Sequence, residues 1–355
     1  MSLKSIAEIF LPEGSVSQLT AFGSGHINET YLVQSTDGQH YILQKINQYV
    51  FKNPVAVMEN CVAVTRFLSQ KDPDPRHVVH FLTTHDGIYY HVDEHGEYWR
   101  MYDYLEGFCL DMPESHEDLY QSALAFGRFQ TLLADFPAHT LHETIPHFHD
   151  TPQRYAQLRA SVEADPAGRL AACQDTVDQV LSHEDIASVL QRALEKGQLP
   201  LRVTHNDTKL NNVLLDPETR QGLCLLDLDT VMPGLSLHDF GDAVRFGAAT
   251  AAEDVQDTDA MGVDLEAYRA YVRGYLESAK MLTEQELQHI PVSPIVLTLE
   301  TAVRFLKDHL DGDMYFHIAY PGHNLVRAKA QLALAEDMLR NYDTMQKILE
   351  EERSK

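Results

Sequence analysis

The chain has 355 residues, 44% of them hydrophobic, and a formal net charge of -25. This length exceeds what one small core needs and predicts two lobes or domains. The apolar fraction is that of an ordinary globular protein and excludes a largely disordered chain. A surface this acidic repels phosphate backbones and anionic lipids, so we expect neither nucleic acid nor a membrane as a partner.

The four cysteines are widely spaced and form no Cys-x-x-Cys pair, which favours reduced thiols over disulfides or a zinc site. No run of about 18 apolar residues occurs, and the N-terminal stretch lacks the pattern of a signal peptide. We therefore expect a cytoplasmic protein, monomeric or weakly self-associating, whose partners are small molecules.

The first third of the chain is predicted to form a small antiparallel sheet. After a short N-terminal helix, residues 30–34 and 41–46 are rich in β-branched and aromatic residues, and a hairpin turn sequence at residues 35–38 separates them. Two further pairs of apolar runs are interrupted at residues 86–87 and 94–96. Strands around one helix are typical of a nucleotide-binding lobe.

A glycine-containing segment, residues 22–28, lies where a loop would cover the phosphates of a nucleotide. Glycine permits a tight turn and close approach of the backbone. The candidate phosphate-binding residues are Gly23, Gly25 and Asn28, and His26 could reach either the phosphates or an acceptor. An ordinary hairpin with turn-capping side chains is the alternative, because the pattern contains only Gly-x-Gly.

The strand that follows the hairpin turn should carry a cation for the phosphates. By strand period the expected position falls on Gln44, while Lys45 points to the opposite face unless a bulge turns it. The next helix should begin at Asn53-Pro54, and it offers Glu59 as an ion-pair partner. A solvated surface residue is the alternative for Glu59.

Residues 99–107 run from a strand into a link, where the backbone near Tyr104 would contact the adenine edge. We place an N-terminal nucleotide-binding lobe at residues 1–103 and a C-terminal helical lobe, with the catalytic loop and acceptor site, at residues 104–355.

From Ser115 onward the apolar spacing is helical. A capping-box sequence at residues 283–286 and the pair Ser293-Pro294 should each start a helix. The last helix is predicted to present the apolar side chains of residues 332–342 on one face.

The segment 203–229 combines a base with oxygen ligands, as a phosphoryl-transfer site requires. Asp207 is placed to accept the proton of an acceptor hydroxyl, and Lys209 can balance charge on the γ-phosphate. Asn212, together with Asp227 and Asp229 at the end of an apolar run, offers hard oxygen ligands for Mg²⁺. A chance His-x-Asp-x4-Asn loop is the alternative, but the second carboxylate element favours the site.

These motifs resemble the aminoglycoside phosphotransferase and choline kinase family, which uses His-x-Asp-x4-Asn and Asp-x-Asp/Glu within a protein-kinase-like architecture. GHINETYLV, HFHDTPQR and HDFGDAVRFG are similar to the members that phosphorylate the anomeric hydroxyl of N-acetylhexosamines. The resemblance implies an α+β two-lobe fold with a small antiparallel β lobe and a large, mostly helical lobe. It also implies ATP as donor, Mg²⁺ as cofactor and an amino sugar as acceptor, bound by His26, Asp207, Phe246, Arg304 and Tyr315.

Several alternatives stay open on the sequence alone. Asp239-Phe240-Gly241 spells the protein-kinase metal motif, but we interpret Asp239 as the cap of its own helix. An ion pair with Asp308 would explain Arg304 without a ligand. The alternate histidines His147 and His149 suit helix capping and packing better than zinc. The acceptor could be choline, methylthioribose, homoserine or an aminoglycoside, and a nucleotide-binding module without turnover is a further class.

Overall fold

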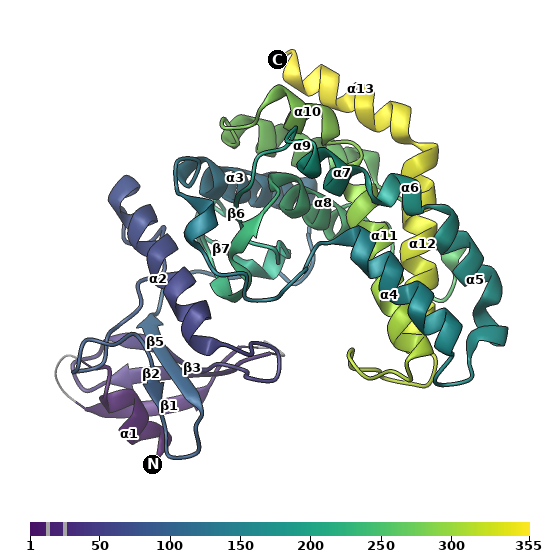
Figure 1. The fold of residues 1–355 in the computed structure, drawn as a ribbon. Coiled ribbons are helices and arrows are strands. Elements are labelled where there is room, and N and C mark those ends of the chain that lie inside the picture. Colours follow the sequence, from purple (N-terminus) through teal and green to yellow (C-terminus); the bar gives the residue numbers. More distant parts are fainter. Residues whose placement is uncertain (12–14, 24–26) are drawn as a thin grey trace. The chain divides into compact units, whose positions relative to one another are not determined.

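The computed structural model describes residues 1–11, 15–23 and 27–355 (Figure 1). Contacts divide them into two compact units, each built from three segments. The first unit comprises Met1–Cys109, Asp135–Pro146 and Asn212–Pro233, and the second comprises Leu110–Ala134, His147–Asn211 and Gly234–Lys355. The expected α+β class is confirmed, with a small antiparallel sheet in the first unit and a larger set of helices in the second.

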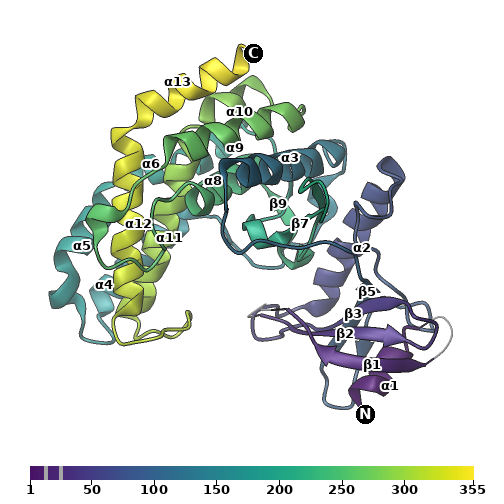
Figure 2. The same cartoon turned by 180° about the vertical axis from the view of Figure 1, so that it is seen from behind.

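The sheet of the first unit has five antiparallel strands in the order β1-β2-β3-β5-β4 (Figure 2). Their bounds are β1 Val16–Ala21, β2 Glu29–Ser35, β3 His40–Lys45, β4 His91–Val92 and β5 Tyr98–Asp103. The predicted hairpin is confirmed, because β2 and β3 pair from Glu29 opposite Lys45 to Gln34 opposite His40. Strands predicted on both sides of residues 86–87 were wrong: the structure has a turn there, held by Gly87 N–H to Thr84 O at 2.9 Å.

Helices cover the two faces of this sheet. The predicted N-terminal helix is α1 (Leu3–Glu8), and its Ile6 packs in a core with Val33, Leu43 and Met101. The alternate side chains of β3 and β5, among them Gln44 and Arg100, point to the other face, where Arg100 contacts Met58 of α2 (Pro54–Lys71). Asn53 caps α2 as expected, because its side chain accepts a hydrogen bond from the Ala56 amide.

A short hairpin completes the first unit, with strands β7 (Val213–Leu215) and β8 (Gly222–Leu225), and the 3-10 turn η3 (Leu228–Thr230) follows it. Helix α2 holds the segment after the hairpin. The Asn60 side chain donates to Val231 O at 2.9 Å, and Cys61 Sγ lies 3.3 Å from Leu228 O.

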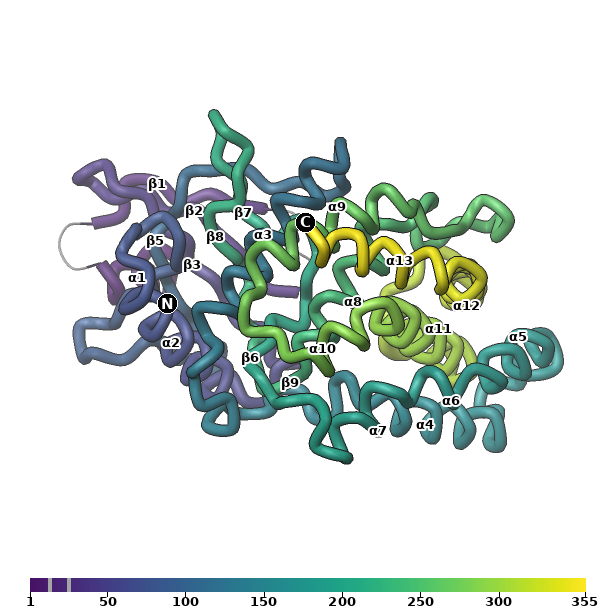
Figure 3. Tube along the Cα trace, turned by 90° about the horizontal axis from the view of Figure 1, so that it is seen from above, coloured from purple at the N-terminus to yellow at the C-terminus, as the bar shows by residue number. Residues whose placement is uncertain are grey.

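The second unit is built around α11 (Ser293–Leu310), which packs against α12, α8 and α4 (Figure 3). The other helices are α3 His116–Leu132, α4 Thr151–Ala164, α5 Leu170–Ser182, α6 Glu184–Ala187, α7 Val189–Glu195, α8 Ser236–Gly247, α9 Leu265–Ser278, α10 Glu284–His289, α12 His323–Arg340 and α13 Tyr342–Arg353. Its short elements are β6 Arg202–Thr204 and η4 Thr258–Ala260, whereas η1 Ala138–Thr140 lies in the first unit, and η2 Leu210–Asn212 and β9 Met232–Gly234 span the division between the units.

The helix starts expected at Ser293-Pro294 and at the capping box of Thr283 and Glu286 are confirmed. The helix predicted over residues 332–342 is α12, but it ends at Arg340 and is not the last, because α13 follows after Asn341. None of the described helices combines the length and the apolarity that crossing a membrane requires.

Candidate phosphoryl-transfer site

The loop that carries Asp207 belongs to the second unit, where Asp239 of α8 holds it. The Asp239 carboxylate accepts hydrogen bonds from the amides of His205 at 2.9 Å and Asn206 at 2.8 Å. Beyond Asp207, the Thr208 hydroxyl donates to the Asp239 backbone carbonyl at 2.9 Å. One residue therefore fixes the backbone on both sides of the proposed base.

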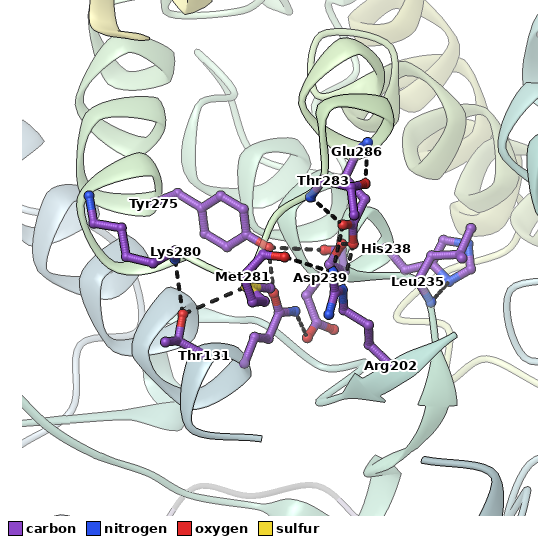
Figure 4. Close-up of polar contacts among 12 residues, drawn as sticks. Thr131, Arg202, Leu235, His238, Asp239, Tyr275, Lys280, Met281, Thr283 and Glu286 are labelled. Carbon is purple, nitrogen blue, oxygen red and sulfur yellow. Dashed lines mark hydrogen bonds and ion pairs between the residues drawn. The ribbon is translucent and has the colours of Figure 1, made fainter. Parts of the chain in front are cut away.

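This corrects our interpretation of Asp239 as the cap of its own helix. Helix α8 already begins at Ser236, and the Asp239 carboxylate is fully buried (0% exposed) under the loop, where Gln130 also donates to it at 2.7 Å. Burial raises the pKa of Asp239, although the loop amides oppose the shift. Figure 4 shows Asp239 among polar side chains that include Tyr275, Arg202 and Glu286.

Lys209 Nζ lies 3.0 Å from the carboxylate of Asp207. Burial alone would lower the pKa of Lys209, but the charge of Asp207 outweighs it and raises that pKa. The negative charge of Asp242 on α8 also raises the pKa of Lys209. Asp242 forms an ion pair with Arg245 at 2.8 Å. Burial opposes ionisation of Asp242, yet the nearby Arg245 and His149 keep its pKa below the ordinary value. Charges of both signs therefore lie close together, with Asp207 and Lys209 on the loop and Asp242 and Arg245 on α8.

Asn212 and Asp227 belong to the first unit, at the open end of the β7–β8 hairpin. Val213 pairs with Leu225, and the Leu226 amide donates to the Asn212 carbonyl at 2.8 Å. This pairing brings the two expected metal ligands to the same end of one hairpin. Asp227 itself has a positive φ of 54°, a left-handed conformation that is uncommon for a residue other than glycine.

Asp229 is an ion-pair partner in the first unit. It is 1% exposed and pairs with Nη1 of Arg100, and its second oxygen accepts from Asn28 Nδ2 at 2.7 Å. Gln44 Oε1 accepts from Nε and Nη2 of Arg100 at 3.0 and 2.8 Å. Arg100 was missed in the sequence, where its signal is a lone cation inside the otherwise apolar and aromatic strand Tyr98–Tyr102.

The other candidate donor-binding residues lie in the first unit with separate partners. Lys45 pairs with Glu29, while the exposed Glu59 lies 2.7 Å from His142 and makes no ion pair with Lys45. Tyr104 follows β5, and its amide donates to His40 O at 3.2 Å. Gly23 has a φ of 79°, as a tight turn requires. Gly25 and His26 lie outside the described residues.

Arg304 of α11 lies between two aromatic rings in the second unit. Its guanidinium is 5.4 Å from the ring centre of Phe148 and 5.5 Å from that of Phe316. The expected alternative, an ion pair with Asp308, does not occur, because the Asp308 carboxylate accepts from the amides of residues 314–316. Within the part of the chain that the structure describes, Arg304 donates no hydrogen bond. Its donors are therefore open to a ligand.

The other expected acceptor-binding residues differ in exposure. Phe246 is half-buried on α8, and Tyr315 is 60% exposed and stacks edge-on against Phe316. The carboxylate of Glu300 is hydrogen-bonded to His149 at 2.9 Å and to the Thr151 hydroxyl at 2.7 Å. Although burial would raise it, the charge of His149 lowers the pKa of Glu300 to about 2.

The described protein side chains alone supply too few ligands for the expected metal ion, so a bound nucleotide would have to supply the others. In the described ranges, no cluster of three or more His, Cys, Asp or Glu side chains is suited to hold a metal ion. The oxygen donors of Asn212 and Asp227 fit Mg²⁺ only if phosphate oxygens and waters complete its octahedral shell, which is how this ion is usually bound. The residues therefore fit a metal–nucleotide complex better than a resident metal.

A small antiparallel sheet in one unit and a larger set of helices in the other match the protein-kinase-like fold expected from the sequence. Residues 18–276 match the model of the phosphotransferase enzyme family, and the chain belongs to this family.

Solved structures share the fold at low identity. A microcompartment-associated aminopropanol kinase is 18% identical, with 97% of each chain covered and a TM-score of 0.66. An aminoglycoside phosphotransferase from Alicyclobacillus acidocaldarius is 13% identical, with 99% of this chain and 97% of that chain covered and a TM-score of 0.62. An amicoumacin kinase in complex with AMP-PNP, Ca²⁺ and Ami is 13% identical over 92% of this chain and 91% of that chain, with a TM-score of 0.63.

Proposed function

We propose that the chain is an ATP-dependent N-acetylhexosamine 1-kinase, which transfers the γ-phosphoryl group to the anomeric hydroxyl of an amino sugar. The observation that carries the sugar assignment is Arg304, held between Phe148 and Phe316 with donors open to a ligand. Aromatic faces and guanidinium donors suit a neutral ring that bears hydroxyl and carbonyl oxygens. The stretches similar to sugar kinases support the same acceptor.

In this proposal Asp207 accepts the proton of the anomeric hydroxyl and holds the oxygen in line with the phosphorus. Lys209, whose ammonium nitrogen lies 3.0 Å from Asp207, offers positive charge to the γ-phosphate. Asn212 and Asp227 would hold Mg²⁺, which supplies positive charge to the phosphate oxygens when bound. Asp239 keeps the loop backbone fixed, so the base needs little reorganisation.

A kinase of another small alcohol is the second candidate. The net charge of -25 would attract a cationic acceptor, and one structural neighbour is an aminopropanol kinase. Around Arg304, however, the charges disfavour a cationic acceptor. Arg154 is an electrostatic neighbour of Arg304, and the carboxylate of Glu300 is already bonded to His149 and Thr151.

An acceptor screen tests the proposal. We expect ATP consumption with N-acetylglucosamine or N-acetylgalactosamine, a sugar 1-phosphate by phosphorus NMR, and little turnover with choline, homoserine, methylthioribose or aminoglycosides. Asp207→Asn should lower kcat by about 10²–10⁴-fold, because general-base catalysis contributes this much. Turnover of an amino alcohol alone would assign the second candidate. Nucleotide binding without any product would indicate a binding module, and a kcat for Asp207→Asn within a few fold of wild type would contradict the base assignment.

A further inference from the structure

Four side chains from four segments of the first unit meet around one buried ion pair. Arg100 comes from β5, Gln44 from β3, Asn28 from the segment before β2, and Asp229 from η3. Gln44 accepts from two nitrogens of the guanidinium, and the third nitrogen pairs with Asp229. Asn28 donates to the other oxygen of Asp229 and accepts from the Asn47 amide at 3.0 Å. We call these four residues the Arg100 network.

Burying this ion pair costs free energy, because both charges are removed from water. Arg100 is 2% exposed and Asp229 is 1% exposed, so both charges have lost their water. Replacing such a pair with apolar side chains is often neutral or stabilising, so stability alone does not explain it. The network engages both oxygens of Asp229 and all three guanidinium nitrogens, which instead fixes the geometry of the segments that carry them.

Those segments are the ones that a metal–nucleotide complex would contact. Asp227 lies two residues before Asp229 and has a left-handed backbone, which persists only when its surroundings hold it. On one side the Leu226 amide is bonded to Asn212, and on the other side Asp229 is bonded to Arg100. Asn28 ends the segment expected to cover the phosphates. The network thus holds the metal-ligand turn and the end of that segment together.

Lys45 does not take part in this arrangement. It follows Gln44 on β3, points to the opposite face, and pairs with Glu29. Its surroundings form a separate pocket of about 410 Å³ that Glu29, Asn47, Gln48 and Glu97 help to line. The cation that is bonded to the metal-ligand segment therefore comes from β5 and not from β3.

We propose that Arg100 is the positioning cation of the donor site, acting through Asp229 to orient Asp227 and through Asn28 to place the phosphate-covering segment. Asp229 is then the carboxylate that anchors Arg100, rather than the third metal ligand expected from the sequence. The inference rests on the proposed kinase function, because it assigns a role within the ATP site.

The test measures binding of AMP-PNP by calorimetry, with and without Mg²⁺, for Arg100→Met, Arg100→Lys and Asp229→Asn. Partners that orient a metal ligand commonly change affinity by about 10–100-fold, so we expect Arg100→Met and Asp229→Asn to raise the Kd for Mg²⁺·AMP-PNP by this factor. Arg100→Lys should recover part of the affinity. The effects should shrink in EDTA, and the donor KM should rise more than the acceptor KM.

Arg202→Met is the control, because Arg202, 12% exposed, forms an ion pair with the buried Glu286 in the second unit, with Nε to Oε1 at 2.6 Å. It should lower Tm like Arg100→Met but leave the Kd of AMP-PNP unchanged. If Arg100→Met does not fold, Asp229→Asn and Arg100→Lys carry the test.

Three outcomes overturn the inference. In the first, folded Arg100 and Asp229 variants bind Mg²⁺·AMP-PNP within twofold of wild type. In the second, Lys45→Met loses more affinity than Arg100→Met. In the third, the loss is the same in EDTA, so it does not pass through the metal ligand. Failure of the wild-type protein to bind the nucleotide at all would instead contradict the proposed function.

Discussion

Two histidine rings meet inside the helical unit, and the protonation of one of them, His238, couples stability to pH. The ring centres of His149 and His238 are 4.8 Å apart. Burial, together with the charge of His149, lowers the pKa of His238 to about 3. The unfolded chain, with an ordinary pKa of about 6.5, therefore binds a proton in a pH range where the folded chain does not. Stability must fall as the pH falls from about 6.5 to about 3.

His238→Gln tests this coupling. A single group of this kind contributes a slope of up to about 1.4 kcal/mol per pH unit in the unfolding free energy, with stability rising toward neutral pH. We expect the variant to lose less stability than wild type between about pH 6 and pH 4.5, as measured by urea unfolding at each pH. In the folded protein Glu300, with a pKa of about 2, stays ionised in this range. Its carboxylate in the unfolded chain begins to protonate near its ordinary pKa, but this loss is the same in both proteins and cancels from the comparison. Parallel pH curves for the two proteins would contradict the assignment.

For individual residues, the sequence predicted which side chains form the phosphoryl-transfer motif, but it did not predict which side chains they contact. Asp207, Asn212 and Asp227 stand out because their spacing alone suggests chemistry, and their site roles stay predictions. Arg100 and Asp229 are 129 positions apart, and no local pattern links them. The function of Asp239 was equally hidden, because an acidic residue in the first turn of a helix usually caps that helix.

Among the elements, α8 carries the aspartate that fixes the catalytic loop, and its packing depends on a close approach to α11. A Cβ atom at Gly241 would lie 2.6 Å from the carbonyl oxygen of Ser293, a backbone atom that cannot rotate away. At Gly247, on the same helix, a Cβ atom would meet Cδ2 of Leu119 at 2.5 Å, the end of a flexible side chain. A Cβ atom at Gly241 would therefore meet a rigid backbone atom, whereas one at Gly247 would meet a side chain that can move.

We expect Gly241→Ala to destabilise the protein by about 1–3 kcal/mol, the usual cost of overpacking. Gly247→Ala should cost less or be neutral, because alanine favours a helix by up to about 1 kcal/mol over glycine and Leu119 can change rotamer. Urea midpoints at one pH compare the pair. Equal destabilisation by both substitutions would show that the α8–α11 contact yields as easily as a side chain does.

Elements with strong local signals were predicted well. The hairpin of β2 and β3, the start of α2 at Asn53, and the starts of α10 and α11 depend on turn and capping residues that act within a few positions. The errors have tertiary causes. Residues 86–87 form a turn without flanking strands, and Asn341 interrupts an otherwise continuous apolar face between α12 and α13.

For the whole molecule, the net charge of -25 opposes the approach of an anionic nucleotide. Salt screens this repulsion, since the Debye length falls from about 30 Å at 0.01 M to about 8 Å at 0.15 M. At saturating free Mg²⁺, we therefore expect kcat/KM for ATP to rise about twofold or more as KCl increases over this range. The value for a neutral sugar should hardly change and serves as the control. A fall for ATP would mean that local positive charge outweighs the acidic surface.

The first unit is assembled from segments that leave the ribosome far apart in time. Arg100 is translated 129 residues before its counter-ion Asp229, and at about 5–20 residues per second this gap lasts about 6–26 s. Until then Arg100 on β5 lacks the carboxylate of Asp229, with which it forms its buried ion pair. We therefore expect nascent chains shorter than about 229 residues to keep this sheet open to chaperones, so that folding of the first unit waits for the hairpin to emerge.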